Sequence, residues 1–192
     1  MFHHFHNKHH KKTQGSISAT KFQKIIKYLK TKYNLINSHE FYKKVINRKI
    51  KKKDICLTFD DCLKSQFDIA FPVLKKNNIS AFFFVYSSVF DRKPNNLEIF
   101  RDFRNTKFLS IDKFYESFFN LLKERFNKDY LLFDKKFKKN YLEKYKFYSL
   151  GDRKFRFCRD KILSLKTYEK IMVLLMKQKK YNFRNAKIKL FM

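Results

Sequence analysis

Ile55-Cys56-Leu57-Thr58-Phe59-Asp60-Asp61 gives the clearest indication of the fold. The run from Ile55 to Phe59 is apolar and rich in strand formers, it is too short for a helix, and it ends at two adjacent carboxylates. Apolar residues at helical spacing then predict a helix over about residues 65–76, which is kinked at Pro72 or begins later. Residues 79–86 predict a second buried strand. This order of strand, helix and strand predicts a parallel β-α-β unit.

Helical patterns lie on both sides of this unit. Apolar residues at spacings of three and four predict a helix after Ser18 or Thr20, either of which can serve as its N-cap. A second short helix is predicted over about residues 38–45. Downstream, the pattern predicts an amphipathic helix capped by Ser110, a turn at residues 150–152 and a last helix over about residues 167–178.

The composition excludes several classes of protein. The chain has 192 residues and 25 Phe, so it is not disordered, and it is long enough for a core of its own. Lys and Arg total 46 against 17 Asp and Glu, which gives a net charge of +29. Because the lysines are spread evenly along the chain, with no stripe or tail, we expect no specific nucleic-acid binding. Weak, non-specific binding of polyanions stays open as an alternative.

The cysteines and the apolar segments indicate a compartment. Cys56, Cys62 and Cys158 cannot all pair within the chain, and their spacing matches no zinc knuckle, which favours a reducing environment. The first residues lack the features of a signal peptide, and the longest nearly uncharged stretch, residues 79–90, is too short to span a bilayer as a helix. We therefore expect a cytoplasmic protein without a transmembrane segment.

The paired carboxylates are the candidate catalytic groups. Asp60 and Asp61 follow a buried strand, and the carboxyl ends of parallel strands are where β/α folds place their ligands. Neighbouring carboxylates can divide the work, since one can bind a metal ion while the other accepts a proton. A turn or a helix cap is the structural alternative, because two Asp after a strand also suit that role.

The same segment resembles the first motif region of the polysaccharide deacetylases, also called the NodB-homology domain or carbohydrate esterase family 4. The resemblance covers about residues 55–90 and is carried by Leu57-Thr58-Phe59-Asp60-Asp61, Asp68-Ile69-Ala70, Pro72-Val73-Leu74 and Ile79-Ser80-Ala81-Phe82-Phe83-Phe84-Val85. The His-rich opening and residues 155–160 look similar to a subgroup with a helical insertion. The resemblance implies an α/β fold in which residues 1–90 form the N-terminal part of an irregular (β/α) barrel and residues 91–192 form a mainly helical insertion.

The resemblance also implies an activity. Asp60 would be the general base and Asp61 a ligand of a divalent metal, usually zinc, in the hydrolysis of an N-acetyl group on an amino sugar of a cell-envelope polysaccharide. Cys62 stands where the family usually has Gly.

One departure from the family is larger. The family supplies its other metal ligands from a later histidine motif, yet no histidine follows His39. We therefore expect a chain truncated before that motif and inactive alone, or a half-barrel that needs a second chain, or a non-catalytic fragment. His4 and His6 share a face of an extended segment and are candidates for additional metal ligands or for lining the site.

Overall fold

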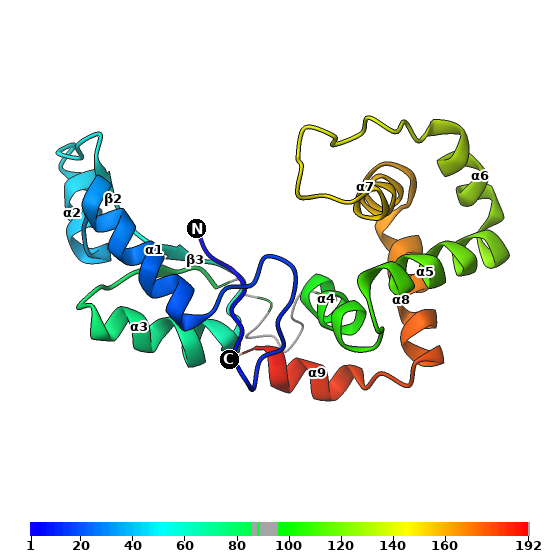
Figure 1. The fold of residues 1–192 in the computed structure, drawn as a ribbon, viewed down its shortest axis with the longest axis horizontal. Helices are drawn as coiled ribbons and strands as arrows, with labels where there is room; N and C mark the ends of the chain where they lie inside the picture. Colours follow the sequence, from blue (N-terminus) through cyan, green and yellow to red (C-terminus); the bar gives the residue numbers. More distant parts are fainter. Residues whose placement is uncertain (86–87, 89–95, 192) are drawn as a thin grey trace. The chain divides into compact units, whose positions relative to one another are not determined.

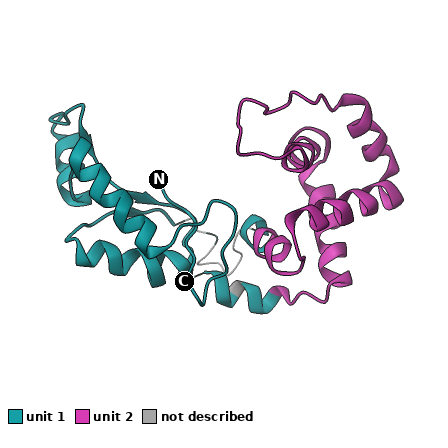
Figure 2. Cartoon of the chain, in the orientation of Figure 1, with its two compact units in different colours: residues 1–99, 184–192 teal, residues 100–183 magenta. Residues whose placement is uncertain are grey.

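The computed structural model describes residues 1–85, 88 and 96–191, which fall into two compact units. Figure 1 shows the elements along the chain, and Figure 2 colours the two units. Unit 1 comprises residues 1–99 and 184–192, and unit 2 comprises residues 100–183. The candidate carboxylates therefore belong to unit 1.

Short parallel strands organise unit 1. β1 (Asn34–Leu35) pairs with β2 (Asp54–Ile55), and β3 (Thr58–Phe59) pairs with β4 (Phe82–Phe83). The sequence predicted one strand over residues 55–59, whereas the structure divides this run between two pairs. β1 was not predicted, because a strand of two residues is too short to show a periodic pattern.

The predicted β-α-β unit is confirmed, because β3 and β4 are parallel and helical segments lie between them in the chain. These segments are a π-helical turn, η1 (Gln66–Ala70), and an α-helix, α3 (Phe71–Lys76). The α-helical part thus begins at Phe71, just before Pro72 and later than the predicted residue 65, and the π-helical turn runs directly into it. Tyr86, the last residue of the predicted second strand, lies outside the described residues.

The two helices predicted upstream are also present in unit 1. α1 (Ala19–Lys32) begins after Ser18, whose hydroxyl accepts a hydrogen bond from the Lys21 backbone N–H at 3.2 Å. Ser18 rather than Thr20 is thus the N-cap. α2 (Ser38–Ile46) has no fully buried residue, although Phe41 is partly buried and its ring centroid lies 6.3 Å from that of Phe82.

Aromatic rings fill the core of unit 1. Phe59 of β3 is fully buried, and its ring stacks on that of Phe83 with the centroids 4.6 Å apart. Rings from Phe2, Phe5 and Phe22 lie within 6.0 Å of the Phe59 centroid. The core thus joins the N-terminal segment, α1 and the strand that ends at Asp60. Its buried residues are Phe5, Phe22, Ile26, Leu57, Phe59, Ile69, Ala70, Leu74 and Ile79.

Unit 2 is helical in every part that the structure describes as regular. Two helices cross the boundaries between the units: α4 (Asn96–Thr106) and α9 (Phe183–Leu190). Unit 2 itself contains α5 (Ile111–Arg125), α6 (Asn127–Lys136), α7 (Leu150–Phe157), the π-helical η3 (Cys158–Ile162) and α8 (Leu165–Gln178). The predicted N-cap of α5 is confirmed, because the Ser110 hydroxyl accepts from the Lys113 N–H at 3.3 Å. Ser164 caps α8 in the same way.

The turn predicted at residues 150–152 is wrong, because these residues form the first turn of α7. The Ser149 hydroxyl accepts from the Asp152 N–H at 3.1 Å, and an Asp152 carboxylate oxygen accepts from the Ser149 N–H at 3.0 Å. This reciprocal cap begins a helix in spite of Gly151. A Cβ at Gly151 would lie only 2.8 Å from Cδ2 of Tyr115, so the glycine permits a close approach to α5.

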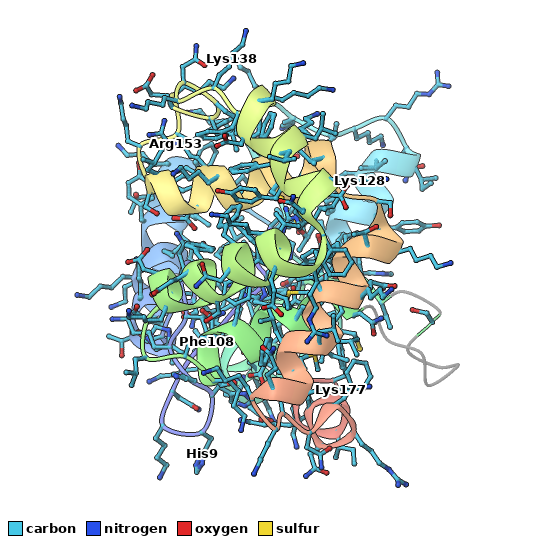
Figure 3. The ribbon with its side chains drawn as sticks, turned by 90° about the vertical axis from the view of Figure 1, so that its right-hand side faces the viewer. His9, Phe108, Lys128, Lys138, Arg153 and Lys177 are labelled. Atoms are coloured by element: carbon cyan, nitrogen blue, oxygen red, sulfur yellow. The ribbon has the colours of Figure 1, made fainter. Side chains whose placement is uncertain are left out.

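The barrel implied by the resemblance is not confirmed. The fold is mixed α/β, but the strands of the described chain form two separate parallel pairs and no closed barrel. In unit 2, Lys128 on α6, Lys138 in the loop after α6 and Lys177 on α8 are all exposed (Figure 3). No helix within the described residues is both long and apolar enough to cross a bilayer.

The buried carboxylate of Asp54 links the strands β1 and β2, so the stability of unit 1 is expected to depend on pH. Its oxygens accept hydrogen bonds from Asn34 Nδ2 at 2.6 Å, the Lys51 N–H at 3.0 Å and Lys44 Nζ at 3.2 Å. These donors, with Asn34 first, lower the pKa of Asp54. The stability that Asp54 contributes is therefore fully present above the carboxyl's unfolded pKa and is lost as the pH falls through its lowered folded pKa.

We expect Asp54→Asn to flatten the acid limb of the stability curve, as measured by urea unfolding at a series of pH values below 6. Asp134→Asn, an exposed carboxylate on α6, is the control. Equal flattening in both variants would contradict the assignment to Asp54.

Candidate functional site

The loop after β3 carries the two candidate carboxylates in an unusual backbone conformation. Asp61 has a φ of 76° and Cys62 a φ of 52°, so two consecutive non-glycine residues are left-handed. Each such residue costs about 1–2 kcal/mol relative to a right-handed conformation. Glycine, which the resemblance leads one to expect at position 62, adopts this region freely. Cys62 is buried in this strained loop, and strain of this kind concentrates at functional sites.

The N-terminal segment lies alongside β3. The Phe2 N–H donates to the Thr58 carbonyl at 2.8 Å, the Asp60 N–H donates to the Phe2 carbonyl at 3.2 Å, and Phe2 and Phe59 form a parallel bridge. Because strands in parallel register advance together, this pairing brings His3 level with Asp60.

His3 contacts both carboxylates. Its Nδ1 lies 2.9 Å from an oxygen of Asp61, and its Nε2 lies 4.0 Å from an oxygen of Asp60. A carboxylate can only accept, so Nδ1 is the donor to ionised Asp61. The side chains of Asp60, Asp61 and His3 are 25%, 28% and 38% exposed, and water can therefore reach all three groups.

Gln66 of η1 holds the His3 segment and the Asp60–Asp61 loop in place. Its side chain is 1% exposed, and its Nε2 donates to the backbone carbonyls of both His3 and Asp60. One side-chain amide thus holds the N-terminal segment and the carboxylate loop together. Its Oε1 is buried and accepts no hydrogen bond from the described residues.

The other predicted histidines lie apart from the carboxylates. His4 Nε2 contacts a carboxylate oxygen of Glu98 in α4 at 2.8 Å, and His6 Nδ1 contacts the Ser16 hydroxyl at 2.9 Å. The sequence singled out His4 and His6, whereas the structure brings His3 to Asp60 and Asp61. The pairing of Phe2 with Phe59 determines this choice, and no periodic pattern in the sequence reveals it.

The residues around Asp60 and Asp61 do not by themselves fit a catalytic metal ion. Within residues 1–85, 88 and 96–191, no group of three or more His, Cys, Asp or Glu side chains is arranged to hold one. A catalytic zinc normally takes three protein ligands and keeps one open position. The candidate site thus offers a carboxylate pair with a histidine partner, which is only part of a zinc site.

Comparison with known proteins finds a family similarity in this region. Residues 47–107 match the family model described as polysaccharide deacetylase. No curated protein and no solved structure matches the chain. The matched segment contains β3, the Asp60–Asp61 loop, η1, α3 and β4, whereas His3 and the N-terminal segment lie outside it. Residues 47–107 are therefore similar to part of a polysaccharide deacetylase domain.

Proposed function

We propose that this chain supplies part of the active site of a metal-dependent hydrolase that removes an N-acetyl group from an amino sugar of a polysaccharide. Asp60 is the general base in this proposal, Asp61 is one ligand of a divalent cation, and zinc is the expected metal. The observation that carries the proposal is the position of both carboxylates directly after β3, within the segment that matches the deacetylase family.

The contacts of the two carboxylates support different roles for them. His3 donates to one oxygen of Asp61, and a hydrogen bond of this kind orients a ligating carboxylate. Asp60 lies farther from the imidazole and is partly exposed, so it can accept a proton from a water molecule. Gln66 holds the backbone of Asp60 and of His3, and it therefore acts as a positioning residue for the pair.

We further propose that the 192-residue chain is inactive by itself. The described residues contain no three-ligand group, and a single carboxylate cannot hold a catalytic zinc ion. In this proposal, residues 1–90 are the N-terminal part of the deacetylase-like barrel and residues 91–192 are the helical insertion. Additional ligands are then required for hydrolysis.

Zinc titration followed by NMR of the His3 ring tests the role of Asp61. We expect zinc to shift the His3 ring signals, and we expect Asp61→Asn to weaken this binding by at least about tenfold, because a charged ligand is lost. His39→Ala, an exposed histidine on α2, is the control and should leave the His3 response unchanged. An unchanged titration in Asp61→Asn would contradict the assignment.

An assay of acetate release tests the proposed inactivity. The purified chain, supplied with zinc and an N-acetylglucosamine oligomer, is expected to release no more acetate than Asp60→Asn does. Zinc-dependent release by the unaltered chain that is lost in Asp60→Asn would overturn the inactivity and support Asp60 as the base.

A further inference from the structure

Unit 1 contains a pocket whose lining does not include Asp60 or Asp61. It has a volume of about 390 Å³ and is lined by Asn7, His9, His10, Lys64, Asp68 and Lys189. The N-terminal loop and α9 lie side by side at this position (Figure 1). The volume falls within the range of small-molecule sites, about 300–1,000 Å³.

Hydrogen bonds fix the wall of this pocket. The Asn7 side-chain oxygen accepts from the backbone N–H groups of His9 and His10 at 2.8 and 2.9 Å, and the Asn7 N–H donates to the His10 carbonyl at 3.0 Å. His10 Nε2 lies 2.7 Å from an oxygen of Asp68 in η1. The His10 side chain is only 14% exposed, so the loop is tied to η1 by a partly buried contact.

The charges of the pocket do not cancel. Asp68 is its one acidic lining residue, and the imidazole of His10 already engages that carboxylate. Lys64 and Lys189 form no ion pair with any residue that the structure describes. His9 lies exposed on the loop (Figure 3) and adds a further nitrogen donor at the rim. Among the described lining residues, two lysines thus stand against one carboxylate, which leaves an excess of positive charge.

We propose that this pocket binds a phosphate group. A phosphomonoester carries a charge of about −1.5 to −2 at neutral pH, which complements this excess of positive charge, and lysine binds phosphate as a point charge. This site is separate from the proposed deacetylase site, because it binds a phosphate group and hydrolyses no bond. The phosphate can be free or carried by a sugar.

Calorimetric titration of the full chain at constant ionic strength tests the pocket with three probes: inorganic phosphate, glucose 6-phosphate and glucose. We expect both phosphates to bind at one site and glucose not to bind. Tighter binding of glucose 6-phosphate would identify a sugar-borne phosphate as the ligand, and equal binding would identify the phosphate group alone. Either result supports the proposal.

The double variant Lys64→Met/Lys189→Met should weaken phosphate binding by at least about tenfold, because two charged contacts are lost. Lys135→Met/Lys136→Met, at the exposed end of α6, changes the net charge equally and should have no such effect. Equal weakening in both double variants, or no binding by the unaltered chain, would overturn the proposal. Because the titration uses no metal and no acetylated sugar, such a failure would leave the roles proposed for Asp60 and Asp61 untouched.

Discussion

Replacing Phe59 with alanine is expected to lower the free energy of unfolding of unit 1 by about 3–5 kcal/mol. Phe59 is fully buried and is enclosed by the rings of Phe2, Phe5, Phe22 and Phe83. Its removal leaves a cavity among partners that come from three distant parts of the sequence, so the site cannot collapse by a local adjustment. The same change loosens the strand that presents Asp60.

Hydrogen exchange resolved by peptide, together with urea unfolding, measures this loss. Protection should fall in residues 1–85, which include the N-terminal segment and β3. Phe67→Ala removes a ring that is 53% exposed in the same unit, and it should cost less than about 1 kcal/mol. If the two variants lose the same stability, Phe59 is not the centre of the core.

The prediction for Phe59 rests on a part of the fold that the sequence shows well. The apolar run ending at Asp60 indicates a buried strand, and the paired carboxylates mark its end. Helices with clear amphipathic patterns and serine caps are likewise found where expected, as α1 after Ser18 and α5 after Ser110 show. In these cases the signal is local, because periodicity and capping depend on residues that are near one another in the chain.

The features that were missed depend on contacts between distant residues. His3 reaches Asp61 because Phe2 pairs with Phe59, and Gln66 joins the two segments through a side-chain amide. Neither contact leaves a periodic mark in the sequence. The turn expected at Gly151 failed for a different reason, since the signal is local: Ser149 and Asp152, three residues apart, form a capping box that overrides the glycine.

The second large effect is expected in unit 2, where replacing Phe155 with alanine should cost about 3–5 kcal/mol. Phe155 of α7 is 1% exposed, and its ring centroid lies 5.0 Å from that of Phe118 and 5.3 Å from that of Tyr115. The guanidinium carbons of Arg104 and Arg159 lie 5.5 and 5.7 Å from the same centroid. The variant thus loses ring packing and two cation–π contacts at once.

Arg104 makes this position especially sensitive. Burial lowers the pKa of its guanidinium, and its Nε is buried without a hydrogen-bond partner among the described residues. Without the Phe155 ring, the Arg104 guanidinium keeps its desolvation cost but loses a favourable neighbour. We therefore expect α7 to detach from α5. Protection against hydrogen exchange should then fall in residues 111–125 and 150–162. Phe147→Ala, where the ring is 67% exposed, should change the exchange of these residues little. Unchanged protection in Phe155→Ala would show that α5 and α8 hold unit 2 together without this ring.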